Sequence, residues 1–62
     1  MTRTEMLQEI DALRAKGHIV GILGSVGAWT CSIDDLTGAG TTPVEAYQTA
    51  KECLVAVEAA RS

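Results

Sequence analysis

Five side chains are considered first as candidates for catalysis, metal binding or redox reactions: His18, Cys31, Asp34, Asp35 and Cys53. A histidine acting as a general base needs a nucleophile beside it, and no serine or cysteine lies near His18 in the sequence. Neighbouring aspartates on a strand point to opposite faces and cannot share a proton or a cation. We therefore expect no catalytic site, no metal and no cofactor, and we interpret the two aspartates as a solvated strand end.

The two cysteines lie outside any C-x-x-C or cysteine/histidine metal spacing. Both fall on faces that we expect to be buried, so we interpret Cys31 and Cys53 as small buried thiols in the reduced state. A disulfide between the expected strand and helix that carry them is the alternative, which a reducing cytosol disfavours.

Length and charge limit the remaining possibilities. The chain has 62 residues and 47% apolar content, which is typical of one small globular domain. A domain of this size has a marginal core, so self-association is the expected source of extra stability. The formal charge of −3, from 5 basic and 8 acidic residues, gives no electrostatic footprint for nucleic acid or an anionic membrane.

The first residues carry charges where a secretory signal would have its apolar core. No apolar run approaches the roughly 20 residues that a membrane-spanning helix needs. We therefore expect a cytoplasmic protein that does not enter a membrane.

The first predicted helix covers residues 3–16. Thr2 and Glu5 form a capping-box pattern at its start, and Gly17 is a stop signal after its end. Its buried face is marked by apolar residues at helical spacing: Met6, Ile10 and Leu13.

The second predicted helix starts at Pro43. Thr42 serves as its N-cap, and Glu45 is placed to accept a hydrogen bond from the N–H of that cap. Its predicted buried stripe is rich in small side chains and consists of Ala46, Tyr47, Ala50, Cys53, Leu54 and Val57. Small residues let a helix approach a sheet closely, so we expect this helix to lie on a sheet.

Two strands are predicted between the helices, over residues 18–23 and 28–34, from a β-branched apolar run and a strict alternation. The connection is either a two-residue turn at 24–25 or a four-residue loop at 24–27. Both loops have even length, so both predict the same two faces. The face expected under the helices carries Val20, Ile22, Trp29, Cys31 and Ile33.

The opposite face is more apolar than a solvated face should be. It carries Ile19, Gly21 and Leu23, with Val26 in the connection. Because an isolated hairpin is marginally stable and has open edges, we predict a homodimer or higher oligomer that extends or stacks the sheets through these four residues. The alternative is a short third strand within 36–41 that shields one edge.

Residues 34–41 are expected to link the sheet to the second helix, with glycines that allow positive φ. The segment Gly38-Ala39-Gly40 is too short for a dinucleotide fingerprint, and nearby carboxylates would repel phosphate. The predicted fold is one α+β domain over residues 1–62, of the form α-β-β-(short β)-α, with two helices packed on one face of a small antiparallel sheet.

Acidic side chains are the remaining feature with functional content. We expect Asp34 and Asp35 near the start of the second helix, and Glu45 and Glu52 on its outer face. Together they predict a surface that docks on a basic partner, where charge improves association rate and specificity more than affinity.

The stretch from Trp29 to Leu54 resembles the strand, loop and T-P-x-E-A-x-x-x-A helix of the HicB-like antitoxin family, and also short phage-encoded proteins. The residues that carry this resemblance are Gly27, Trp29, Gly40, Thr42, Pro43, Glu45, Ala46 and Ala50. The chain differs from that family in having an added N-terminal helix.

The resemblance implies a non-enzymatic protein that binds and neutralises another protein. Our leading hypothesis is a small phage-type inhibitor or accessory protein, such as an anti-CRISPR or another anti-defence factor. Its acidic surface would cover the basic nucleic-acid-binding face of a host complex. The alternatives are a HicB-like antitoxin module that neutralises a small toxin, and an oligomeric binder of a small molecule or nucleotide.

Overall fold

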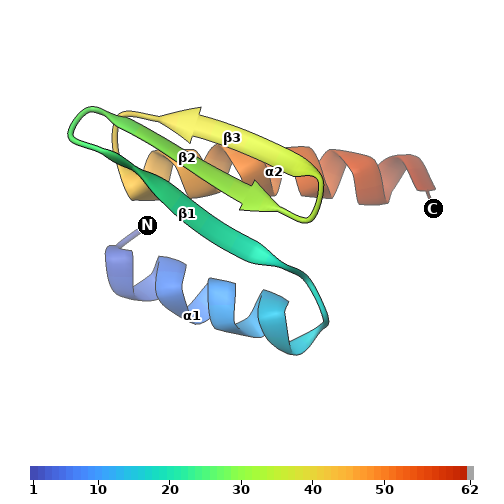
Figure 1. Ribbon diagram of the computed structural model, residues 1–62. Helices are drawn as coiled ribbons and strands as arrows, with labels where there is room; N and C mark the ends of the chain where they lie inside the picture. The colour runs from blue at the N-terminus through green and yellow to red at the C-terminus, as the bar shows by residue number, and fades with distance from the viewer. Residues whose placement is uncertain (62) are drawn as a thin grey trace.

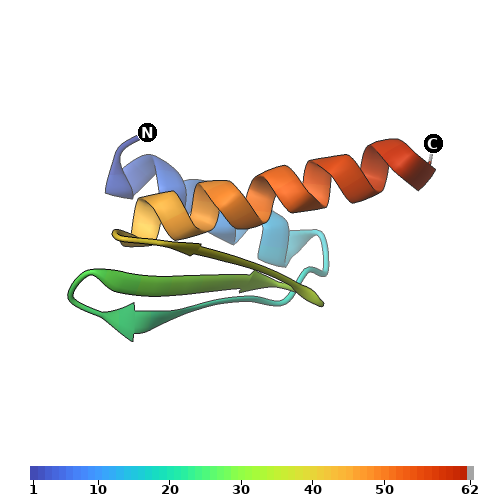
Figure 2. The same cartoon turned by 90° about the horizontal axis from the view of Figure 1, so that it is seen from above.

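The computed structural model describes residues 1–61 and has the order helix, three strands, helix (Figure 1). The elements are α1 (Arg3–Ala15), β1 (Val20–Ser25), β2 (Ala28–Ile33), β3 (Leu36–Gly40) and α2 (Pro43–Arg61). The strands form one antiparallel sheet in the order β1-β2-β3, and both helices lie on the same side of it (Figure 2). The predicted α+β fold, including its short third strand, is confirmed.

Both helices begin where the sequence predicts. The Thr2 hydroxyl accepts a hydrogen bond from the Glu5 N–H at 3.2 Å, and the Thr42 hydroxyl accepts one from the Glu45 N–H at 3.2 Å. The Glu45 carboxylate reaches one residue further back than expected. It accepts from the backbone N–H of Thr41 at 3.0 Å and from the Thr41 hydroxyl at 2.6 Å, rather than from the N–H of the cap residue.

The turn between β1 and β2 lies later in the chain than predicted. Val26 and Gly27 form a two-residue turn, so neither predicted loop forms. Gly24 is instead a strand residue opposite Trp29, where an added Cβ would lie only 2.7 Å from the Trp29 Cα. Because the observed turn also has even length, the two predicted faces of the hairpin are retained.

The core lies between the sheet and the two helices. Three residues of the hairpin's predicted inner face are buried, and the other two, Ile22 and Trp29, are half-buried against the core. The buried side chains come from the sheet and from both helices: Met6, Ile10 and Leu13 of α1, Val20, Cys31 and Ile33 of the sheet, and Ala46, Tyr47, Ala50 and Leu54 of α2.

The helix α2 has 19 residues, and its last turns project past the end of the sheet (Figure 1). Val57 of the predicted stripe is half-buried there because no strand lies beneath it, and Cys53, on the flank of the helix, is also only half-buried. Cys31 and Cys53 are both free thiols, so the alternative disulfide does not form. Between residues 1 and 61, no helix is long and apolar enough to cross a bilayer.

The strand β3 packs closely against α2 through glycine. An added Cβ at the buried Gly38 would collide with the backbone nitrogen of Ala50 and lie 2.7 Å from the carbonyl oxygen of Ala46. An added Cβ at Gly40 would lie 2.6 Å from the Cβ of Glu45. Neither glycine has positive φ, contrary to our expectation for this segment. They are required because they let two backbones approach, not because they turn the chain.

Candidate functional site

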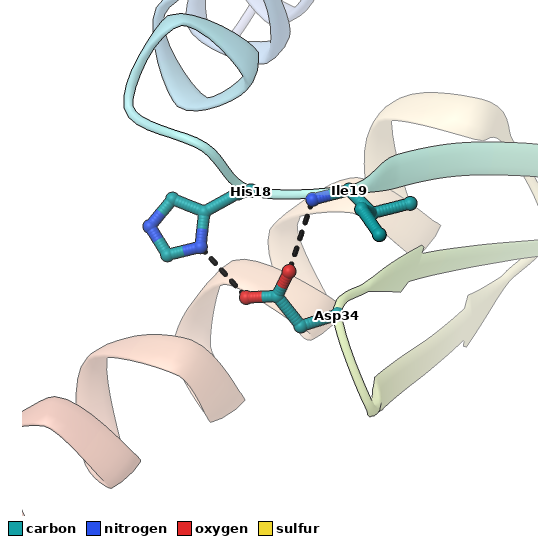
Figure 3. Close-up of polar contacts among 3 residues, drawn as sticks. All are labelled: His18, Ile19 and Asp34. Atoms are coloured by element: carbon teal, nitrogen blue, oxygen red, sulfur yellow. Dashed lines mark hydrogen bonds and ion pairs between the residues drawn. The ribbon is translucent and has the colours of Figure 1, made fainter.

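A polar cluster at the open end of the β1–β2 hairpin joins His18, Ile19 and Asp34 (Figure 3). The backbone N–H of Asp34 donates to the carbonyl oxygen of Ile19 at 2.8 Å, and the Ile19 N–H donates to Asp34 Oδ1 at 2.9 Å. His18 Nδ1 lies 2.7 Å from Asp34 Oδ2. The Ile19 N–H and then the imidazole lower the pKa of the Asp34 carboxyl, so it is ionised at neutral pH. We term these three residues the hairpin clasp.

The clasp depends on the strand register. Asp34 is the first residue of the two-residue turn between β2 and β3, and its φ of 54° is one that aspartate tolerates better than most residues. The observed register places it opposite Ile19, whereas the predicted turns would have placed it opposite Gly17 or Ala15. Sequence reasoning therefore missed the contact with His18, and Asp34 is a bonded turn residue rather than a free strand end. Gly27 could have predicted the correct turn, because glycine is favoured at the second position of a two-residue hairpin turn.

An open hollow of about 130 Å³ lies beside the clasp, between the end of the sheet and the last turns of α2. Its lining mixes charged and apolar side chains: His18, Asp34, Asp35, Leu36, Leu54, Val57, Glu58 and Arg61. Pockets that enclose a drug-sized ligand have volumes of roughly 300–1,000 Å³. This hollow has room for an ion, a water molecule or the tip of a partner's side chain.

The His18–Asp34 pair has the orientation of two members of a hydrolytic triad, but a triad also needs a nucleophile. No side chain that lines the hollow is a serine, threonine or cysteine. Cys31 lies in the core, where burial raises the pKa of its thiol. Within residues 1–61, no three histidine, cysteine, aspartate or glutamate side chains are placed to hold a metal ion. The clasp joins the residue before β1 to the residue after β2 and so closes the open end of the hairpin.

The start of α2 does not present a free anion site. The Glu45 carboxylate accepts both polar hydrogens of Thr41, and these two hydrogen bonds lower the pKa of Glu45. A negative charge of the chain itself thus occupies the place at the helix N-terminus where a bound anion would sit. Gly38 and Gly40, which could have formed a cradle, are used in packing against α2.

The four acidic residues predicted to form one docking surface lie in two separate pairs. Asp34 and Asp35 form the β2–β3 turn and line the hollow with the C-terminal turns of α2, rather than lying near the start of that helix. The reason is that β3 carries the chain back along α2 before the helix begins. Glu45 and Glu52 are both exposed on α2, and the Glu45 carboxylate turns back to Thr41 at the start of the helix.

The four residues predicted to mediate self-association are all exposed, and Val26 lies in the turn at the tip of the hairpin. Gly21 is exposed, and the side chains of Ile19, Leu23 and Val26 are 78%, 81% and 100% exposed. They lie on or beside the side of the sheet that faces away from both helices, which we term the open face (Figure 2). The rest of the open face is small and uncharged, consisting of Ser25, Ala28, Thr30, Ser32, Thr37 and Ala39.

No model of a protein family matches this chain, and neither curated proteins nor solved structures include a significant match to it.

Proposed function

We propose that the protein is a non-enzymatic inhibitor that acts by binding another protein. In this proposal it is a small phage-type anti-defence or accessory protein, of the anti-CRISPR kind. It docks the outer face of α2 on a basic, nucleic-acid-binding face of its target. The observation that carries the proposal is the charge of that outer face, which presents Glu45 and Glu52 and no basic side chain.

The two glutamates are spaced for docking on a surface. They are seven residues apart, so their side chains leave α2 from the same side, about 10 Å apart along the helix axis. The basic residues of α2 lie elsewhere: Lys51 contacts Glu9 of α1 at 2.8 Å, and Arg61 lines the hollow. The charge on the outer face is therefore negative only, and it complements phosphate-binding surfaces, which are positive.

Electrostatic docking of this kind has a recognisable signature. Exposed charges mainly raise the association rate, and their effect weakens as salt concentration rises. The inhibitor would compete with nucleic acid for the same basic residues of the target, so nucleic acid and inhibitor would not bind together.

The proposal can be tested by affinity capture from bacterial lysate, followed by identification of the retained proteins. We expect the native chain to retain a nucleic-acid-binding protein and to be displaced from it by added nucleic acid. The double variant Glu45→Gln/Glu52→Lys should lose this target. Asp11→Lys, an exposed charge reversal on α1, is the control and should retain it. Equal capture by the double variant would rule out docking through α2.

A HicB-like antitoxin module is the second candidate. The observation that favours it is that β2, β3 and α2 pack together as one unit across the stretch that carries the resemblance. The test is co-expression with a small toxin encoded alongside the protein. Co-purification of the two chains and relief of toxicity would support this candidate, and retention of toxicity would exclude it.

A further inference from the structure

The strand β1 lies at the edge of the sheet, and β2 is its only partner among the strands (Figure 1). The Asp34 N–H donates to the Ile19 carbonyl oxygen, so the backbone groups of Ile19 point toward β2. In an antiparallel pair this direction alternates along the strand, so the backbone groups of Val20, Ile22 and Gly24 point outward. An edge of this kind is a template on which a further strand can pair.

The strand itself carries none of the features that usually protect an edge. Lysine, proline and bulges prevent further pairing at the edges of soluble sheets. The strand Val20–Ser25 reads VGILGS, which contains no charged residue and no proline, and it pairs with β2 without a bulge. Any protection of this edge therefore comes from outside the strand.

The helix α1 runs alongside β1, next to its outer edge and on the helix side of the sheet (Figure 1, Figure 2). The last turn of α1 carries Arg14, and its Nη2 donates to the Val20 carbonyl oxygen at 3.0 Å. Arg14 comes six residues before Val20, and Gly17, with a φ of 96°, lies where the chain reverses between them. The outward carbonyl at the start of β1 is thus occupied by a charged donor, which makes a stronger hydrogen bond than a neutral one.

We propose that α1 is an edge cover for β1, and that Arg14 is the residue through which it prevents a further strand from pairing there. With Val20 occupied and the Val26-Gly27 turn close behind, the free part of the edge spans residues 22–24. This free edge is about 10 Å long, at the short end of the lengths of strands in proteins. A strand that paired along all of β1 would first have to displace the guanidinium from Val20.

The opposite edge of the sheet is protected by its own sequence. The outward residues of β3 are Thr37 and Ala39, and this strand has five residues, LTGAG, of which two are glycines. Short length and glycine both weaken strand pairing. A cover is therefore needed at β1, and α1 lies there. The contact between Arg14 and Val20 does not involve the outer face of α2, so this inference does not depend on the proposed function.

Arg14 is also a tether between α1 and β1, and the two roles predict different results. Loss of a tether lowers the free energy of unfolding, whereas loss of a cover makes folded chains associate. Arg14 is exposed, so its substitution leaves the buried side chains of the core in place. The association of folded chains is the readout that separates the two roles.

Sedimentation equilibrium of Arg14 variants tests the cover. Arg14→Met keeps the apolar stem but removes the donor, so it should associate roughly tenfold more tightly than the native chain. Arg14→Lys keeps a charged donor and should behave like the native chain. Arg3→Met is the matched control, because Arg3 is exposed on the same helix and its loss gives the same net charge. Unchanged association of Arg14→Met, or an equal gain in Arg3→Met, would overturn the proposal. Circular dichroism checks that the variants are folded, and Arg14→Gln replaces the methionine variant if it is not.

A second substitution in the Arg14→Met background shows which surface the associated chains use. Leu23→Lys places a lysine on β1, where it blocks edge pairing, and should restore the association of the native chain. Thr37→Lys is the matched control, since Thr37 is exposed on β3, and it should leave the tighter association unchanged. Rescue by Thr37→Lys alone would place the contact on β3, and equal rescue by both would place it on the open face. Either result would overturn the proposal.

Discussion

The two faces of the sheet are made from alternate residues of the same strands, yet different physical constraints determine their residue types. On the covered face, Val20, Cys31 and Ile33 are buried and Gly38 lies against the backbone of α2. On the open face, Leu23 and its neighbours are exposed. The covered face is specified by shape, because its helix and strand approach too closely for an added methyl group.

The open face is distinguished by its lack of charge rather than by hydrophobicity alone. Exposed leucines and valines are common on protein surfaces. A sheet face that only meets water, however, tolerates lysine and glutamate at every position, and this face has neither. Packing within the chain therefore explains the residue types of the covered face, but not those of the open face. The open face is neutral on all three strands.

Truncating one large side chain on each face should give the largest contrast. Ile33→Ala should lower the free energy of unfolding by about 3 kcal/mol, because it removes a fully buried side chain and leaves a cavity. Leu23→Ala, measured by urea denaturation at concentrations where the chain is monomeric, should change it by less than about 0.5 kcal/mol. Since a domain of this size is marginally stable, the milder Ile33→Val keeps the loss measurable. Equal losses on the two faces would break the comparison.

The same glycine substitution on each face gives the next contrast. Gly38→Ala should destabilise the fold by about 2 kcal/mol, because the new methyl group meets the backbone of Ala46 and Ala50. Gly21→Ala adds a methyl group at an ordinary contact distance of 3.6 Å from Ser32 Oγ and should change stability by less than about 0.5 kcal/mol. Thermal denaturation of the two variants measures the difference. If Gly38→Ala is neutral, the close approach of β3 and α2 is not required.

A smaller effect is expected from the polar contact between the two covering helices. The Tyr47 hydroxyl donates to Glu9 Oε1 at 2.8 Å, and Lys51 donates to the same atom at 2.8 Å. Tyr47→Phe should cost about 1 kcal/mol in denaturant unfolding, the usual net value of one hydrogen bond. Lys51→Met should cost less, because that ion pair is about one-third exposed. A larger loss in the lysine variant would show that the ion pair, not the phenol, holds α1 to α2.

The smallest effect is a pH dependence at the hairpin clasp. The N–H of Ile19 and the His18 imidazole lower the pKa of Asp34 in the folded chain, so its charge stabilises the fold above the ordinary aspartate pKa. This contribution should disappear as the pH falls below about 4 and through the lowered folded value. Asp34→Asn keeps an acceptor for Ile19 and tolerates the positive φ, so it should be slightly less stable than the native chain at neutral pH and equal to it in acid. Thermal midpoints across this pH range provide the measurement. A stability gap that persists in acid would mean that the charge of Asp34 is not the cause.

Much of the fold could be predicted because it rests on local rules. Helix starts depend on residues three positions apart, as in Thr42 and Glu45, and the core faces of both helices follow from the spacing of apolar residues. The two faces of the hairpin could be predicted although its turn was misplaced. Strand alternation is preserved whenever the turn shifts by two residues.

The rest depends on contacts between distant residues, which local rules do not specify. The pair Val26-Gly27 is a weaker turn signal than Gly24-Ser25, so the predicted pairing of β1 with β2 was wrong. The contact between His18 and Asp34 was missed for that reason. Gly38 reads as a flexible loop residue until the helix that it touches is known. The acidic residues divide into two pairs because β3 reverses the chain between Asp35 and Glu45, a reversal that the charge pattern does not record.

The even length of the Val26-Gly27 turn decides which insertions this protein can accept. Two added residues at the hairpin tip would only lengthen the loop and could carry a label or a short epitope. If a single added residue were absorbed by a register shift of one strand, its apolar side chains would face water and its polar ones the helices. Natural relatives and engineered versions of this chain should therefore differ at the tip by pairs of residues.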